Sequence, residues 1–291
     1  MVGSVPAVPI RTLTALVLVV LAAACVPPED DDSIPRFDPK ETLAGKIQKR
    51  GVLMVGVEED AGPVASVSGG GPEGFTVEMG RWLAEGLGVD AEFVAGTTDE
   101  LATMVSDDEV DVAFPMTPIT EAALDEHLFG DPYFVAHQRL LVPESSAIGG
   151  VEDLSGQTVC EVPDPTGVEV AGLNPDVADS MRADPVDCLE ELEAGRVDVI
   201  SAADIVLIPL MARSGEPLEM VGDDLTTAGY GAMVGRDPLG LDSYIDSVFA
   251  EADQEGRWAE LYAEWIGPYA DDPEAEPPAM TFEEAAAINP L

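Results

Sequence analysis

The feature that most constrains the fold is a helix-to-strand unit that the chain uses twice. In the first copy, apolar residues at helical spacing from Leu101 to Val105 lead into the strand-like run VDVA at 110–113. In the second copy, those from Leu189 to Leu192 lead into VDVI at 197–200. The apolar connector Leu140–Val142 lies between the two copies. Two such units predict two similar α/β lobes rather than one large sheet.

The segments around these units also alternate between strand and helix patterns. Val52–Val57 predicts a buried strand, Phe75–Leu87 a helix and Glu92–Ala95 a second strand, and Tyr230–Val234 begins a return to the first lobe. Two amphipathic helices follow, whose aromatic residues we assign to the core. A chain that crosses twice between lobes has a cleft at their junction, where small ligands bind preferentially and which closes by a hinge motion.

The N-terminus predicts export. Residues 1–25 carry Arg11, an apolar run from Leu13 to Leu21 and then three alanines before Cys25, a signal-peptide pattern too short to span a bilayer. Cys25 after small residues predicts a diacylated cysteine that anchors the protein to the outer face of the cell membrane. Ordinary cleavage near Ala24 and an uncleaved anchor are the alternatives.

These patterns divide the chain into segments with distinct roles. A flexible acidic and Pro-rich linker follows the signal peptide, and an acidic, Pro-rich tail with one short helix at Phe282–Ile288 ends the chain. The predicted segments are 1–25 (signal peptide), 26–42 (linker), 43–141 (first part of lobe 1), 142–228 (lobe 2), 229–268 (return to lobe 1) and 269–291 (tail).

Composition excludes several classes of function. With 13 Lys and Arg against 57 Asp and Glu, the net charge of −44 repels nucleic-acid phosphates. The acidity fits either adaptation to high salt or a generic acidic exported surface. His127 and His137 are the only histidines, neither in a triad context, and metal-ligand spacing is absent. We therefore expect neither a metal, a cofactor nor enzyme activity. We also expect a monomer.

Five short motifs resemble one known family. In chain order they are KRGVLMVGV at 49–57, GFTVE at 74–78, DPY at 131–133, GRVD at 195–198 and EGRW at 255–258. They resemble the family-3 extracytoplasmic solute-binding proteins of ABC importers, and VAHQ at 135–138 with Cys160 and Cys188 is most similar to glutamate-binding lipoproteins. The resemblance implies a type II periplasmic-binding-protein-like fold, with two lobes joined by two hinge strands. It also implies a small-molecule ligand and ABC permease partners.

The sequence departs from the family pattern where the family holds an amino acid. The family's clamp reads Ser/Thr-x-Thr-x-x-Arg, and here Thr120 is kept while Ala123 occupies the Arg position. In the second lobe, Ala203 occupies the position of the Asp that binds the ammonium group. Asp164-Pro165-Thr166 replaces a Gly-Ser-Thr loop, and a proline has no N–H to donate to a carboxylate.

Six residues remain as candidate ligand contacts: Thr120, Thr166 and Asp204, with Asp60 and Thr117 as weaker candidates, and Arg139 on the hinge strand as a displaced carboxylate partner. Three of these six residues also have a structural interpretation that involves no ligand. Thr120 is equally consistent with a helix N-cap and Asp204 with a solvated residue at a strand end, whereas for Arg139 a hinge salt bridge is the favoured interpretation.

Cys160 and Cys188 are the cysteines left once Cys25 is lipidated. In an exported protein we expect them to form a disulfide that stiffens the second lobe, the alternative being two buried thiols.

The predicted function is a membrane-anchored solute-binding protein of an ABC importer, which captures a small polar solute, an amino acid or an amine, by cleft closure. A non-transport sensor or accessory lipoprotein with a degenerate amino-acid site is the alternative. A periplasmic dehydratase-like enzyme is less favoured.

Overall fold

The structure, a computed structural model, describes residues 1, 3, 34–236, 239–270, 272 and 274–288. Met1–Ser33 and Ile34–Leu291 form separate units, and the second unit is the folded body. The predicted signal peptide lies almost entirely outside the described residues, as does Cys25. Among the described residues, every helix is too short or too polar to span a bilayer.

Lobe 1 contains a five-stranded sheet with the strand order β4-β1-β5-β12-β6. β1 pairs in parallel with β4 and with β5, whereas β12 runs antiparallel to β5 and β6. The bounds are β1 Val52–Glu58, β4 Asp90–Gly96, β5 Val112–Phe114, β6 Leu128–Ala136 and β12 Ala228–Val234, with a small hairpin of β2 Ser66–Ser68 and β3 Gly71–Glu73. The strands predicted at 52–57, 92–95, 110–113 and 230–234 are confirmed as β1, β4, β5 and β12.

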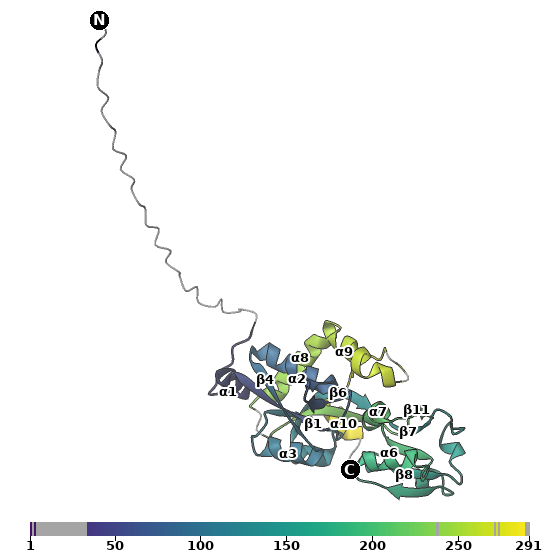
Figure 1. Ribbon diagram of the computed structural model, residues 1–291. Helices are drawn as coiled ribbons and strands as arrows, with labels where there is room; N and C mark the ends of the chain where they lie inside the picture. Colours follow the sequence, from purple (N-terminus) through teal and green to yellow (C-terminus); the bar gives the residue numbers. More distant parts are fainter. Residues whose placement is uncertain (2, 4–33, 237–238, 271, 273, 289–291) are drawn as a thin grey trace. The chain divides into compact units, whose positions relative to one another are not determined.

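Helices cover both faces of this sheet, with α2 on one face and α3 on the other (Figure 1). α2 ends at Gly88, whose left-handed conformation (φ 65°) terminates the helix. α3 begins at a capping box formed by Thr97 and Glu100. The bounds are α1 Leu43–Arg50, α2 Phe75–Leu87, α3 Thr98–Ser106, α4 Glu121–Leu124, α8 Leu241–Gln254, α9 Arg257–Trp265 and η2 Gly267–Tyr269.

Lobe 2 contains the second five-stranded sheet, ordered β11-β7-β10-β8-β9. β10, β8 and β9 are parallel, and β7 is antiparallel to β10 and β11. The bounds are β7 Gln138–Pro143, η1 Val151–Asp153, β8 Thr158–Glu161, α5 Val170–Leu173, β9 Ala178–Met181, α6 Pro185–Glu193, β10 Val199–Ala203, α7 Asp204–Arg213 and β11 Leu218–Val221. Two mixed α/β lobes confirm the predicted fold class.

The aromatic residues of the last helices belong to the core of lobe 1. Phe75 contacts Tyr133, Phe134, Trp258 and Tyr262 with ring centroids 6.0 to 6.4 Å apart. The Trp258 indole also donates a hydrogen bond of 2.8 Å to the carbonyl oxygen of Tyr133. Burial of these rings fixes α9 against the sheet.

The chain crosses between the lobes at two adjacent places. The first crossing is at His137, since β6 belongs to the first sheet and β7 to the second, whereas the sequence placed this boundary at residue 141. The second lies between β11 and β12. His137 Nδ1 donates to the carbonyl oxygen of Thr226 at 3.1 Å, and the Leu225 amide donates to that of Gln138 at 3.0 Å. These bonds join the crossings into one hinge.

Asp204 and Arg139 both lie at this hinge. The Asp204 amide donates to the carbonyl oxygen of His137 at 2.9 Å, and Arg139 pairs with Asp224 at 3.4 Å. Burial raises the pKa of Asp204 to about 7, although His137, backbone hydrogen bonds and Arg139 act in the opposite direction. The interpretation of Arg139 as a hinge salt bridge agrees with this geometry.

The structure corrects the predicted linker at its C-terminal end. Residues 34–42 pack on the folded body instead of forming a flexible tether. Phe37 contacts the Tyr244 ring edge-on at 5.7 Å, and its amide donates to Gln48 at 3.0 Å. A single aromatic anchor in a polar segment gives no periodicity, so the pattern missed this contact.

The C-terminal helix α10, Phe282–Ile288, forms where the sequence predicted it and packs on lobe 1. It contacts β6, β12 and α4, and Ala285 and Ala286 are buried. The amide of Phe282 donates to Asp131 at 3.0 Å, which anchors the helix to β6. Gly229 on β12 lacks a Cβ that would come within 2.7 Å of the Ala285 Cβ.

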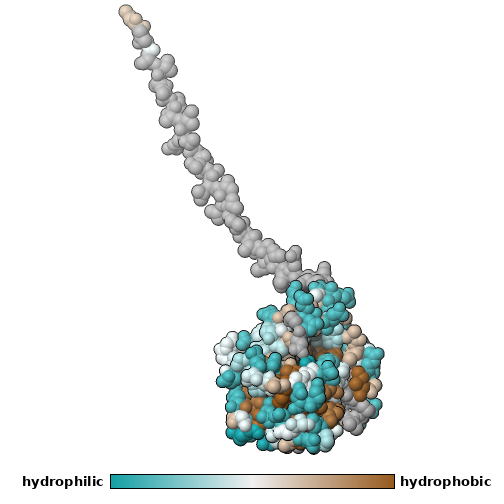
Figure 2. Space-filling model, turned by 90° about the vertical axis from the view of Figure 1, so that its right-hand side faces the viewer, coloured by the Kyte–Doolittle hydropathy of each residue, from teal (hydrophilic) through white to brown (hydrophobic). Residues whose placement is uncertain are grey.

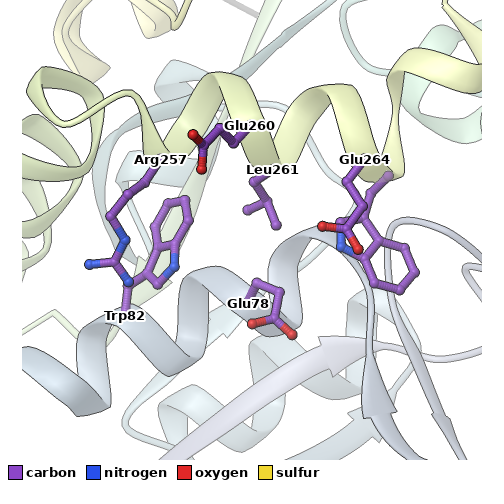
Figure 3. A pocket seen from close by; sticks show the side chains of 7 residues that line it. Glu78, Trp82, Arg257, Glu260, Leu261 and Glu264 are labelled. Carbon is purple, nitrogen blue, oxygen red and sulfur yellow. The ribbon is translucent and has the colours of Figure 1, made fainter.

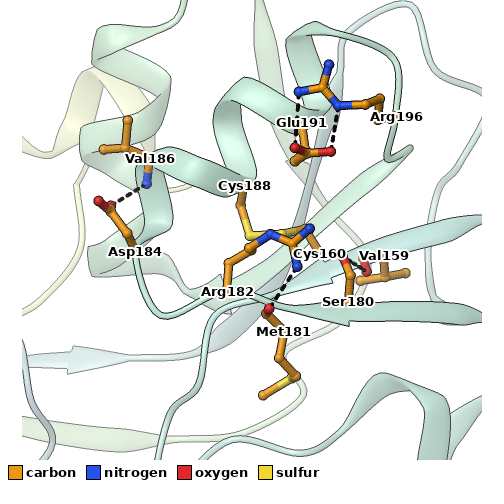
Figure 4. Close-up of a disulfide and its surroundings, with 10 residues drawn as sticks. All are labelled: Val159, Cys160, Ser180, Met181, Arg182, Asp184, Val186, Cys188, Glu191 and Arg196. Carbon is orange, nitrogen blue, oxygen red and sulfur yellow. Dashed lines mark hydrogen bonds and ion pairs between the residues drawn. A yellow bond between two sulfur atoms is a disulfide. The ribbon is translucent and has the colours of Figure 1, made fainter.

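Cys160 on β8 and Cys188 on α6 form the predicted disulfide, with their Cα atoms 5.6 Å apart (Figure 4). Both residues are buried. The bond ties a helix of lobe 2 to β8, which lies between β10 and the edge strand β9.

Removing the disulfide should destabilise the protein. We expect the double variant Cys160→Ala, Cys188→Ala to lose roughly 3 to 4 kcal/mol of unfolding free energy, because the unfolded chain regains the entropy of an open loop. Urea unfolding monitored by tryptophan fluorescence measures the loss. Wild type with a thiol reductant is the control and should show a similar shift, whereas an unchanged midpoint in both would contradict the prediction.

The pKa of Asp204 predicts a pH-dependent stability. The native protein keeps a proton on Asp204 that the unfolded chain releases, so Asp204 lowers the unfolding free energy as pH rises from about 3.8 to about 7. We expect the stability of Asp204→Asn relative to wild type to increase across this window and to level off above it. Urea unfolding at several pH values tests this, and a pH-independent difference would contradict it.

Candidate functional site

A cleft of about 880 Å³ lies where the two lobes meet. Lobe 1 contributes the carboxyl end of β1, the start of α3 and the loop after β5, and lobe 2 contributes the loop after β8, the start of α6 and one face of α7. Ligands of α/β proteins bind at the carboxyl ends of parallel strands, and the cleft lies at these ends of β1 and β8. The lining residues include Glu58, Asp60, Thr98, Thr117, Asp164, Asp184, Ala203, Arg213 and Tyr230.

The cleft is strongly acidic. Six carboxylate side chains line it, three in succession from the last residue of β1 onward and three from other segments, against one basic side chain among the described lining residues, Arg213. The six are Glu58, Glu59, Asp60, Asp99, Asp164 and Asp184. A cleft lined by charges of one sign focuses their field and concentrates ligands of the opposite sign.

Hydrogen bonds from two other segments of lobe 1 hold Glu58 in position. It accepts hydrogen bonds from the Thr98 hydroxyl at 3.0 Å and from the Met116 amide at 3.0 Å. Burial raises the pKa of Glu58, and the hydrogen bonds from Met116 and Thr98 oppose that shift. A carboxylate held in this way can bind a cationic group with little loss of side-chain entropy.

The loop that contains Asp164 belongs to lobe 2 and lines the cleft opposite lobe 1. The amide and hydroxyl of Thr166 both donate to Asp164 Oδ1 at 2.7 Å, and the Tyr230 hydroxyl of lobe 1 donates to Asp164 Oδ2 at 3.5 Å. Gln138 fixes the same loop by accepting from the Val168 amide at 2.7 Å. Asp164 and Pro165 line the cleft, whereas Thr166 serves to orient Asp164 and is not a lining residue.

Thr120 and position 123 serve a structural role at the start of α4. Thr120 is buried, and its hydroxyl accepts a hydrogen bond from the Ala123 amide at 3.0 Å, the N-cap geometry. Ala123 packs against an apolar cluster that contains Ala285 and Phe282 of α10. Neither residue lines the cleft.

The predicted candidates therefore separate into two groups. Asp60 and Thr117 line the cleft, whereas Thr120, Arg139, Thr166 and Asp204 lie in caps, turns or the hinge. Sequence reasoning missed Glu58, Thr98 and Tyr230. Glu58 had a usable signal, because it is the first charged residue after a continuous apolar strand.

A second pocket, of about 380 Å³, lies on lobe 1 between α2 and α9 (Figure 3). The Arg257 guanidinium lies over the Trp82 ring, 4.9 Å from its centroid, and pairs with Glu85 at 2.9 Å. These contacts join the two helices, which makes the pocket a groove of the helix packing. On the face seen in Figure 2, hydrophobic residues lie in separate patches between hydrophilic ones.

Metal binding has no candidate site in the described part of the chain. No group of three or more His, Cys, Asp or Glu side chains is arranged there to hold an ion. The chemistry open to the cleft carboxylates is to accept charge-assisted hydrogen bonds from the cationic groups of a ligand.

Comparisons with known proteins agree with this geometry. The ABC transporter glutamine-binding protein GlnH of Bacillus subtilis is 26% identical over 261 residues, covering 87% of this chain and 95% of that protein. A mutant of ArgBP from T. maritima is similar in structure, with a TM-score of 0.63 and 28% identity, covering 77% of this chain and 98% of that one. An ancestral arginine-binding protein bound to arginine has a TM-score of 0.62 and 25% identity, covering 75% of this chain and 99% of that one.

These relatives are binding proteins, in agreement with the prediction that the chain is not an enzyme. Residues 53–268 match the family described as bacterial extracellular solute-binding proteins, family 3. Because the match covers most of the chain and both sheets, the chain belongs to the bacterial extracellular solute-binding proteins of family 3.

Proposed function

We propose that this protein is the capture subunit of an ABC importer for a small cationic solute, either a basic amino acid or an amine. The ligand enters the acidic cleft between the lobes, and closure about the hinge at His137 encloses it. The observation that carries the proposal is the set of six carboxylates around the cleft, which both lobes contribute.

The physical basis is charge complementarity. A positively charged ligand is drawn to the cleft by its field and replaces the repulsion between carboxylates of opposite lobes with attraction. The ligand interacts with both lobes only in the closed arrangement, so its binding shifts the population toward closure. A ligand carrying only negative charge would add to the repulsion.

The relatives support a ligand of this class. The T. maritima ArgBP and the ancestral arginine-bound protein carry the name of a basic amino acid. Others are named for neutral ligands such as glutamine, so the family name alone does not select a charge. The cleft composition is what favours a cation here.

The proposal also includes the site of action. Cys25, outside the described residues, would carry the lipid anchor that holds the monomer at the outer face of the membrane, within reach of its permease. Of the predicted linker, residues 26–33 lie outside the described residues, and residues 34–42 pack on the folded body.

Binding should depend on the charge of the ligand. In titration calorimetry with the purified protein, we expect L-arginine, L-lysine and putrescine to bind, and L-glutamate to bind weakly or not at all. Added NaCl should weaken binding of the cations by screening. Micromolar glutamate binding would contradict the proposal, and a complete lack of binding and closure would favour the accessory or sensor alternative.

Glu58 should contribute directly to this affinity. We expect Glu58→Gln to weaken binding of the cations about 10- to 100-fold, because a charge-assisted hydrogen bond is worth about 1.5 to 3 kcal/mol. Glu92→Gln is the matched control, since Glu92 is an exposed acid of lobe 1 on β4 and does not line the cleft. Equal affinities of the two variants would contradict the assignment.

The lipid anchor has a separate test. We expect Cys25→Ser to move the full chain from the membrane fraction to the soluble extracytoplasmic fraction, because no acyl chain can be attached. Detergent partitioning and mass measurement of the mature N-terminus check this. A wild-type N-terminus whose mass shows no acyl chains on Cys25 would exclude Cys25 as the anchor.

A further inference from the structure

Arg213 occupies a distinctive place in the acidic cleft. It is the one basic side chain among the described lining residues, and it comes from the last turn of α7 in lobe 2. Its structural role there would be to interact with the negative end of the helix dipole. Its position in the cleft also places it within reach of a second partner, the ligand.

The present contacts of Arg213 leave most of its hydrogen-bonding capacity available. Its guanidinium lies 3.3 Å from the carbonyl oxygen of Asp60 and 3.8 Å from the Asp60 carboxylate. The Arg213 side chain is 42% exposed and that of Asp60 is 88% exposed. An ion pair this exposed contributes little and exchanges readily for a better acceptor. A guanidinium has five N–H donors, enough to bind a carboxylate in bidentate fashion.

The other expected positions for a carboxylate partner are lost in this chain. Ala123 packs toward α10 rather than into the cleft. In the loop after β8, Pro165 has no N–H, and the Asp164 carboxylate already accepts the Thr166 amide and hydroxyl. Arg139 pairs with Asp224 at the hinge and does not line the cleft. A ligand carboxylate in this cleft therefore has one cationic partner among the described residues.

We propose that Arg213 is a specificity-determining residue that binds the ligand's carboxylate from lobe 2, while the ligand's cationic end lies toward Glu58 of lobe 1. This inference rests on the proposed function and narrows its ligand class to basic amino acids rather than simple amines. The orientation is the reverse of the one that the family pattern implied, in which the Arg belongs to lobe 1 and the acidic partner to lobe 2. A ligand held this way bridges the lobes and draws them together.

The test compares ligands that differ only in the carboxylate. Calorimetric dissociation constants are measured for L-arginine, arginine methyl ester and agmatine with wild type, Arg213→Gln and Arg213→Lys. With wild type, we expect arginine to bind at least about tenfold more tightly than either analogue. Each analogue lacks the free carboxylate and therefore loses its charge-assisted hydrogen bonds with Arg213. Arg213→Gln should bring arginine to the level of agmatine and leave agmatine unchanged or improved. Arg213→Lys should retain part of the preference for arginine over agmatine. Lysine keeps the positive charge but lacks the planar guanidinium that binds a carboxylate in bidentate fashion.

The control variant is Arg196→Gln. Arg196 is an exposed arginine of lobe 2 that pairs with Glu191 away from the cleft (Figure 4), so its loss should leave the ratio of arginine to agmatine affinities unchanged. The ratio is the decisive quantity, because a merely structural role of Arg213 would weaken both ligands equally. The comparison of the three ligands on wild type tests the inference even if a variant is unstable.

The failures are distinguishable. If wild type binds agmatine and the ester as tightly as arginine, or if Arg213→Gln weakens all three ligands alike, the inference is overturned while the capture of a cation stands. If wild type binds none of the three, the proposed function itself is overturned.

Discussion

The hydrogen bonds between the two chain crossings determine how the rest of the structure is arranged. His137 Nδ1 donates to Thr226 in the neighbouring crossing at 3.1 Å, and the Leu225 amide donates to Gln138 at 3.0 Å. Because both crossings are in one place, the sheets can move relative to each other mainly as a hinge. The carboxyl ends of β1 and β5 then lie across the cleft from the loop that follows β8.

The hinge also connects the cleft to buried charge. Asp204 begins α7, close to His137, and the same helix ends at Arg213 on the cleft. Gly62 of lobe 1 lies against this helix, where a Cβ would be 3.6 Å from Pro209. A movement of α7 would therefore change the surroundings of the hinge carboxylate and the position of the cleft's basic residue together.

Overall acidity explains part of the cleft but not its organisation. In a chain with 57 acidic and 13 basic residues, several carboxylates in any large cleft are expected from composition alone. What composition does not provide is a partly buried Glu58 that Thr98 and Met116 hold in place. Glu58 is held in place as a binding group, whereas the exposed Asp60 is a solvated surface charge.

Local patterns predicted the elements of the fold well. The helix-to-strand unit repeats as α3–β5 and α6–β10. The disulfide joins Cys160 and Cys188, the two cysteines expected to pair in an exported protein. The N-cap interpretation of Thr120 could be predicted because a cap depends on residues three positions apart. The packing of residues 34–42 and the Glu58 contacts could not, since each joins segments distant in the sequence.

The sequence by itself determined the two α/β lobes, the family and the acidic balance, because these depend on periodicity, motif order and composition. Only the tertiary structure decided which charges face a ligand. Ala123 packs against the apolar cluster that includes the C-terminal helix, Arg139 is engaged at the hinge, and Arg213 reaches the cleft from the end of α7. Side-chain direction across the cleft depends on how the helices pack on two separate sheets, and no spacing within the chain specifies it.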